Sequence, residues 1–307
     1  MMHKHLALSL TFVSMFGCKR PPEAPEGLDE SARFMFREFY SSDDVIGAGL
    51  TGFMDWYDDE GDTLLDATAN PDNVEGFEVA DLASSDLDAI DLDSYAGRDL
   101  SKANGIVSLA AMSCTPAEVE KYNLRSDQME VFEGQFQQYD REYLSSRAVF
   151  EDTTDSGEYP SIDEDIDILS SDFDPDTTEQ VLSLMTNEAV TSDAGVTVAF
   201  TLVQHWRHGI FEIQGEPTEA FLGIGFVPGP KDGETGTVML QQYNVQAVIP
   251  RSGNMEALRL FALWLQVDSP IVPENSPIWS TTSVNKAKQT AERLNEICNG
   301  EVDLPAE

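Results

Sequence analysis

Residues 238–267 read VMLQQYNVQAVIPRSGNMEALRLFALWLQV, and they contain two long strands joined by a turn. Apolar side chains recur at every second position in each half, which is the period of a β-strand. One face of the first strand is expected to carry Met239, Tyr243, Val245, Ala247 and Ile249. The second strand is expected to carry Arg259, Phe261, Leu263, Leu265 and Val267 on one face, and Leu260, Ala262 and Trp264 on the other. The second strand is therefore predicted to be buried on both faces. Residues 251–254, RSGN, supply hairpin-turn residues, so the two strands should be antiparallel neighbours.

Outward from this hairpin, the chain reads mainly as further strands followed by one helix. The additional strands are predicted at 106–112, 142–150, 180–186, 196–206 and 221–227. A final helix is predicted at 283–299, and Gly300 occupies the usual stop position. Its apolar face consists of Val284, Ala287, Ala291, Leu294 and Cys298.

The first part of the chain is predicted to be helical. Amphipathic spacing indicates helices at 29–41 and 45–59. A later short helix should begin after Thr115, because Thr115 can cap it, Pro116 suits its first turn and Glu118 follows. We expect a helical N-terminal segment at 29–66, an α+β core domain at 75–299 and a tail at 300–307.

The order of elements in residues 100–299 resembles the helix-grip fold of the START-like superfamily. A strand leads into a helix, long antiparallel strands follow, and one helix closes the chain. The resemblance implies an α+β fold in which a curved antiparallel sheet packs against the long C-terminal helix. It also implies an apolar ligand in a cavity between sheet and helix. A solid core without a cavity is the alternative, and the sequence does not choose between them.

The N-terminus carries an export signal. Lys4 precedes the apolar run 6–16, which is shorter than the roughly 20 residues of a membrane-spanning helix. Residues 15–18, MFGC, resemble the lipobox of bacterial lipoproteins. The resemblance implies that residues 1–17 are a signal peptide, that Cys18 is the lipid attachment site, and that 18–28 form a lipidated tether. Several acyl chains together would hold the protein on a membrane. Lys19, in place of Asp, resembles the signal for an outer-membrane destination within the cell envelope, on its periplasmic or surface-exposed face. An ordinary signal peptide with an incidental Cys18 is the alternative.

With Cys18 assigned to lipid, Cys114 and Cys298 remain as a pair in an oxidising compartment. We therefore predict a disulfide between them. Two buried free thiols are the alternative.

Net charge restricts the partners. The chain has 56 acidic and 18 basic residues, a formal charge of −38. This excess of negative charge excludes nucleic acid as a direct ligand, and it disfavours anionic lipid headgroups. A self-repelling, solvated surface explains the acidity, and specific cation binding is the alternative.

Several motifs occur without the sequence context that their usual function requires. Gly47, Gly49 and Gly52 match G-x-G-x-x-G, but no strand precedes them, so close helix packing is predicted instead of a dinucleotide. Ser283 and Lys286 form S-x-x-K without the motifs that accompany it in penicillin-binding proteins. His205 and His208 lie on a predicted strand, where odd spacing sends them to opposite faces. The acidic clusters at 163–167 and 172–176 lack the glycine and glutamate of the usual calcium loop.

These observations predict no catalytic, cofactor or metal site. The leading hypothesis is a noncatalytic, membrane-anchored protein that binds an apolar small molecule or a protein partner at the cell envelope. An envelope structural or interaction protein with a filled core comes second. An enzyme comes third, because no acid–base pair or activated nucleophile is marked.

Overall fold

The computed structural model of the chain describes residues 23–61, 65, 79–87, 90, 98–143, 181–193, 196–231, 236–251, 255–274 and 276–305. The predicted signal peptide, Cys18, residues 19–22 of the tether and the acidic clusters lie outside these residues. Within the described part, no helix combines the length and the apolar composition needed to cross a bilayer.

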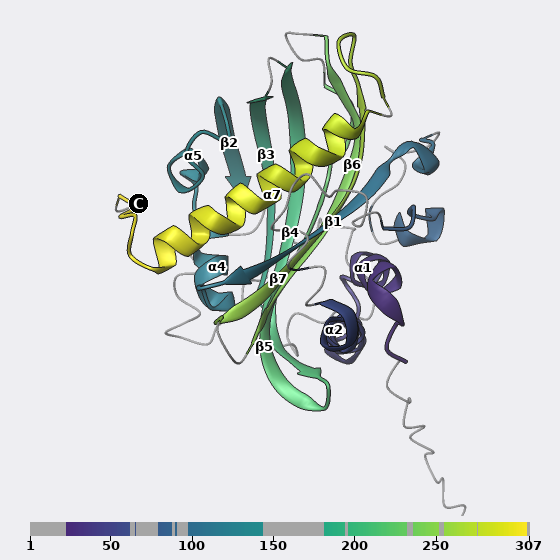
Figure 1. Cartoon of the computed structure of the whole chain (residues 1–307), viewed down its shortest axis with the longest axis vertical. Coiled ribbons are helices and arrows are strands. Elements are labelled where there is room, and N and C mark those ends of the chain that lie inside the picture. Colours follow the sequence, from purple (N-terminus) through teal and green to yellow (C-terminus); the bar gives the residue numbers. More distant parts are fainter. Residues whose placement is uncertain are drawn as a thin grey trace, which may run out of the picture.

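The chain folds into one antiparallel sheet with helices on both faces (Figure 1). The strands are β1 (Asn104–Met112), β2 (Gln138–Tyr143), β3 (Val181–Asp193), β4 (Val196–Ile213), β5 (Glu216–Phe226), β6 (Val238–Pro250) and β7 (Ala257–Asp268). Their order across the sheet is β1-β7-β6-β5-β4-β3-β2. The helices are α1 (Gly27–Arg37), α2 (Asp43–Trp56), α4 (Pro116–Asn123), α5 (Gln128–Val131) and α7 (Pro277–Cys298), with short turns η1 (Tyr57–Gly61), η3 (Ser84–Leu87) and η5 (Leu100–Lys102). The predicted α+β class, with an N-terminal helical pair, a curved antiparallel sheet and a long C-terminal helix, is confirmed.

The first face of the sheet packs against α1 and α2. Tyr243 and Trp264 reach this face from β6 and β7, and both rings contact Phe36 of α1 edge-on. The helices and the sheet share one hydrophobic core. The glycines of α2 permit this packing, because a Cβ at Gly47 would lie 2.6 Å from the carbonyl oxygen of Glu212 on β4. The predicted role of these glycines in close helix packing is therefore confirmed.

The second face of the sheet lies beneath α7, which crosses it diagonally (Figure 1). The helix begins earlier than predicted. Ser276 caps its N-terminus and Pro277 occupies the first turn, so the start at residue 283 was wrong by six residues. Four residues of its predicted apolar face are buried and Cys298 is partly buried; Val284 packs against Ile106 of β1 and Leu263 of β7. The disulfide between Cys114 and Cys298 ties the end of α7 to the segment after β1, with 5.4 Å between the Cα atoms.

Several strands differ from their predicted bounds, and β3 continues past the predicted end at residue 186 to Asp193. β4 continues past residue 206 to Ile213 and returns directly as β5 through Gln214 and Gly215. Both turn residues have positive φ, 52° and 81°, as a two-residue hairpin requires. β2 ends at Tyr143, so it overlaps the predicted strand 142–150 only at its start, and residues 144–150 lie outside the described part. The predicted capping of α4 is confirmed, since Thr115 and Glu118 form a reciprocal capping box.

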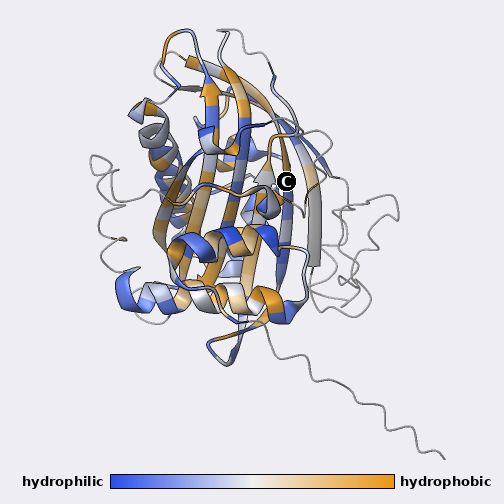
Figure 2. Ribbon diagram, turned by 90° about the vertical axis from the view of Figure 1, so that its right-hand side faces the viewer, coloured by the Kyte–Doolittle hydropathy of each residue, from blue (hydrophilic) through white to orange (hydrophobic). Residues whose placement is uncertain are grey.

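The prediction for β6 was wrong at one residue. Tyr243, Val245, Ala247 and Ile249 face α1 and α2 as expected. Met239 faces the opposite side because the pairing with β7 shifts between Met239 and Gln241. This bulge adds one residue to β6 and reverses the alternation before it. Figure 2 shows polar and apolar residues alternating along the strands, in keeping with a sheet that is covered differently on its two faces.

Candidate functional site

A cavity of about 300 Å³ lies between α7 and the second face of the sheet. Its floor is formed by strands β3, β4, β6 and β7, and its walls by the segment from α5 to β2 and by the chain leading into α7. The predicted β7 face, from Arg259 through Phe261, Leu263 and Leu265 to Val267, runs along this floor. The sequence left a cavity and a solid core open at this place, and the structure has the cavity.

Apolar and aromatic side chains make up much of the lining. Besides the apolar residues of β7, the lining includes Phe132, Phe136, Ala189, Val196, Val198, Phe200, Leu202, Trp206, Met239, Val272, Ile278 and Trp279. Phe136 packs on Tyr139, with 4.8 Å between ring centroids. Such a lining, with a few polar groups placed in it, is typical of small-molecule sites.

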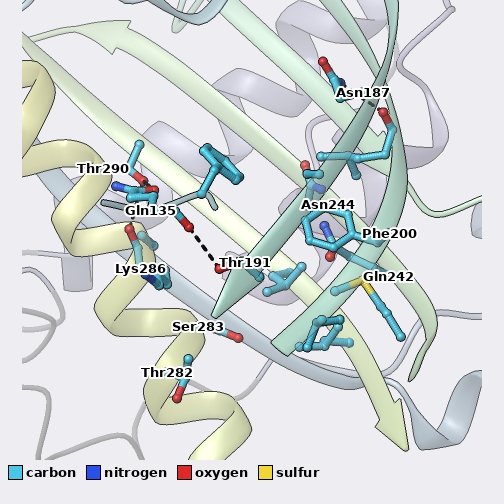
Figure 3. Close-up of a pocket in the computed structure, with 18 of the residues that line it drawn as sticks. Gln135, Asn187, Thr191, Phe200, Gln242, Asn244, Thr282, Ser283, Lys286 and Thr290 are labelled. Atoms are coloured by element: carbon cyan, nitrogen blue, oxygen red, sulfur yellow. Dashed lines mark hydrogen bonds between the residues drawn. The ribbon is translucent and has the colours of Figure 1, made fainter. Parts of the chain in front are cut away.

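The roof of the cavity is the polar flank of α7. Thr282, Ser283, Lys286 and Thr290 come from this helix and face Asn187, Phe200, Gln242 and Asn244 of the sheet across the cavity (Figure 3). The helix keeps this position because its apolar flank packs beside β1 and its end is tied by the disulfide. Thr290 also lies within hydrogen-bonding distance of the Gln135 side chain, which joins the roof to the wall.

The floor carries amides where a solid core would carry apolar side chains. Gln242, Asn244 and Gln246 alternate along β6 and all face the cavity. Asn244 and Gln246 are 6% and 4% exposed. The bulge before Gln241 turns Met239 toward the same face as these amides. Amide side chains at three successive cavity-facing positions favour a site that binds a ligand over one that is simply packed shut.

The lining of the cavity includes a hydrogen-bonded arginine, Arg141 of β2. Arg141 donates to the side chain of Asn187 and to the backbone carbonyls of Asn123 and Arg125. Asn187 in turn donates to the side chain of Gln204 at 2.9 Å. These contacts hold β2, β3 and the end of α4 together. The protein itself supplies hydrogen-bond acceptors for the Arg141 guanidinium, so the role of Arg141 is structural.

A second arginine of the lining, Arg259, comes from β7. Arg259 is 5% exposed, and its guanidinium lies over the ring of Phe261 at 5.3 Å from the centroid. It donates to the side chain of Gln246 at 2.9 Å and to the backbone carbonyl of Ala287 at 3.3 Å. Burial lowers the pKa of Arg259 to about 10, so it stays protonated at neutral pH. The sequence placed Arg259 on the correct face of β7, but nothing in the sequence marked it as a site residue.

The two histidines lie on opposite faces of β4, as their spacing predicted. His205 is buried in contact with Tyr40 of the helical layer, and burial lowers its pKa to about 3. His208 lies on the other face between Glu120 and Glu219. Burial opposes protonation of His208, but its hydrogen bonds and charge interactions with the two glutamates raise its pKa overall. Within the described residues, no group of three or more His, Cys, Asp or Glu side chains could hold a metal ion.

The S-x-x-K pair takes an unexpected position. Ser283 and Lys286 both face the cavity (Figure 3). Within the described part of the chain, no hydrogen bond joins the Ser283 hydroxyl to the Lys286 amine, although activation of a serine nucleophile requires one. The pair therefore contributes polar groups to the roof and does not form a catalytic dyad in this structure.

Comparison with known proteins gives only distant likenesses. No protein-family model and no curated protein matches the chain. Among solved structures, the lipid transfer and protein localization domain of human StarD13 is 10% identical, with a TM-score of 0.34 over 64% of this chain and 77% of that domain. A protein from Chromobacterium violaceum is 10% identical, with a TM-score of 0.29 over 63% of this chain and 96% of its own. Ginseng major latex-like protein 151 from Panax ginseng is 9% identical, with a TM-score of 0.20 over 60% and 96%. We therefore base the functional conclusion on the cavity and not on these likenesses.

Proposed function

We propose that this protein is a noncatalytic binding protein that holds an apolar small molecule between α7 and the sheet. The observation that carries the proposal is the cavity of about 300 Å³. Ligand pockets occupy roughly 300–1,000 Å³, so the space suits a small or slender molecule. The cavity supports this function over that of a structural protein with a filled core.

A noncatalytic role agrees with the chemistry of the lining. Its polar groups are mainly amides and hydroxyls, and no histidine or carboxylate belongs to the described residues that line it. General acid–base catalysis needs a group that exchanges protons near neutral pH within reach of the ligand. Amides and hydroxyls instead orient a ligand by hydrogen bonding.

We further propose that acyl chains on Cys18 hold the protein at the cell envelope. Support comes from the sequence, in which a short apolar run ends at Gly17 and Cys18. A binding protein tethered in this way would take up and release its ligand beside a membrane. Intact-mass analysis of the native protein tests this proposal directly, because an unmodified Cys18 in a chain that keeps residues 1–17 would refute it.

A fluorescence titration tests the binding function. N-phenylnaphthylamine, an apolar dye, should quench Trp206 and Trp279, which line the cavity, and the titration should saturate at one dye per chain. Straight-chain alcohols should displace the dye, with affinity rising roughly fourfold per methylene until the cavity is full. Binding that never saturates, or that shows no upper limit of chain length, would refute a defined cavity site.

A further inference from the structure

The charge of the cavity is opposite to that of the chain. The protein has 56 acidic and 18 basic residues. Among the described residues that line the cavity there is no Asp or Glu, but Arg141, Arg259 and Lys286 are present. An acidic surface keeps the protein soluble and self-repelling, but it does not explain why acids are missing from one apolar hollow that contains cations.

Arg259 is the cation whose bonding is incomplete. Its Nε has no hydrogen-bond acceptor in the described structure, and no ion pair there joins its guanidinium to a carboxylate. Arg207, which is also deeply buried, is satisfied, because it donates to the carbonyls of Phe39 and Ser41 and to the carboxylate of Asp43. A buried charge without a counter-ion is costly. Arg259 lacks a carboxylate partner such as Asp43 provides for Arg207.

Two further donors without an acceptor belong to residues of the cavity lining, and one of these residues, Gln246, is hydrogen-bonded to Arg259. They are Nε2 of Gln246 and Nε1 of Trp206, and both residues line the cavity. In the sheet, Trp206 pairs with Gly223 and Gly223 pairs with Gln246, so the two residues belong to one row across three strands. Gly223 leaves room for the indole, because a Cβ there would lie 2.2 Å from the Trp206 ring. Buried donors without acceptors are rare, and three in the lining of one cavity point to a missing partner with several acceptor atoms.

We propose that the ligand is an acidic amphiphile whose oxyanion head group, a carboxylate or a phosphate, is bound by Arg259, Gln246 and Trp206. The proposal rests on the binding function proposed above and specifies its ligand class. A guanidinium and two N–H groups match the several oxygens of such a head group, and Arg–oxyanion hydrogen bonds are among the strong ones in proteins. The tail would lie along Phe261, Leu263 and the following apolar residues of β7, which continue the cavity floor.

Ligands with one tail and different head groups test the proposal. Decanoic acid, decyl phosphate, decanol and decylamine are titrated against the full chain by isothermal calorimetry. The acid or the phosphate should bind at least roughly tenfold more tightly than decanol, since a hydrogen bond to a charged group contributes that much. Decylamine should bind least tightly, because it brings a second cation to Arg259. Whichever oxyanion binds more tightly identifies the head group.

Variants of Arg259 distinguish the effect of its charge on ligand binding from its effect on the shape of the cavity. Arg259→Met should reduce the preference for the oxyanion over decanol to about twofold or less, as removing the charged donor abolishes the strong bond. The melting temperature of the unliganded variant should stay the same or rise, because an unpaired buried charge is replaced by an apolar side chain. Lys288→Met is the matched control, since it removes one positive charge from α7 outside the cavity lining and should keep the preference. Arg259→Gln replaces Arg259→Met if the latter fails to fold.

The outcomes distinguish the two proposals. Equal affinity of wild type for decanol and the oxyanions would overturn the head-group proposal and leave the binding function standing, with buried water as the partner of the donors. An equal loss of affinity for all four ligands in Arg259→Met would also overturn it, because Arg259 would then only shape the cavity. Failure of all four ligands and of the apolar dye to bind wild type would reject the binding function itself.

Discussion

Filling the cavity from the roof should strengthen the fold and weaken ligand binding. Ala287 and Ala291 lie one turn apart on α7, and both are nearly inaccessible to solvent. Ala287 lines the cavity, whereas Ala291 packs in the cluster that includes Leu294 and Cys114. The substitution Ala287→Leu therefore adds carbon atoms to empty space, and Ala291→Leu adds the same atoms to a filled core.

The expected magnitudes follow from this difference. Three added carbons at Ala287 should stabilise the fold by about 2 kcal/mol, at about 0.8 kcal/mol per buried methylene. The same change at Ala291 should destabilise it by about 1–3 kcal/mol through overpacking. The free energies of unfolding of the two variants should therefore differ by about 3–5 kcal/mol. Ligand affinity in Ala287→Leu should fall roughly thirtyfold, because the tail loses the same apolar contact.

Urea denaturation followed by circular dichroism measures the first effect, and displacement of N-phenylnaphthylamine measures the second. Both variants must give the wild-type denaturant slope for the comparison to hold. If Ala287→Leu is destabilised as much as Ala291→Leu, the space beneath α7 is not available to a ligand. If Ala287→Leu binds the dye as tightly as wild type does, the dye site lies elsewhere.

Three other predictions concern stability. Replacing Cys114 and Cys298 by serine should cost about 5 kcal/mol, because the disulfide spans 184 residues and its loss frees a long loop in the unfolded chain; urea denaturation with and without reductant checks this, and an unchanged midpoint would contradict it. His205 is held neutral with a pKa of about 3 against 6.5 in the unfolded chain, so its contribution is complete above pH 6.5 and is lost as the pH falls toward 3. The stability difference between wild type and His205→Gln should therefore shrink by roughly 2 kcal/mol between pH 6.5 and 4.5, and a pH-independent difference would refute a neutral buried ring. Gly223→Ala should cost about 1–3 kcal/mol and change the near-ultraviolet spectrum, because the added Cβ displaces the Trp206 ring; a neutral substitution would show that the ring moves freely.

Periodicity predicted the parts of the fold in which burial alternates regularly. Both faces of β7 and the apolar face of α7 are where the spacing of apolar residues placed them. The short helix after Thr115 was equally predictable, because capping depends on side chains three residues apart. These features need only local chemistry and the choice of one buried face.

Features that depend on backbone geometry were missed. The bulge before Gln241 reversed the orientation of Met239, and no residue type in the strand marks such an insertion. The tight turn at Gln214 and Gly215 was overlooked because glutamine seldom adopts positive φ. The helix start at Ser276 and Pro277 did carry a recognisable signal, which the apolar periodicity alone does not include.

The site was only partly predictable. The resemblance to the helix-grip arrangement implied a space beneath the last helix, but whether that space is filled depends on packing in three dimensions. Arg259 is in phase with apolar residues on a doubly buried strand, and a charged residue in that phase is a usable signal. Its unmet donor, and those of Gln246 and Trp206, become visible only when their surroundings are known.

Native mass spectrometry of the full chain, released gently from the membranes of the cells that make it, tests the occupied cavity most directly. We predict one additional noncovalent mass per chain, that of an acidic amphiphile, which organic solvent releases and which is less abundant in Ala287→Leu. A wild-type mass that equals the polypeptide with its covalent modifications alone, together with no uptake of added decanoic acid, decyl phosphate or decanol, would contradict it.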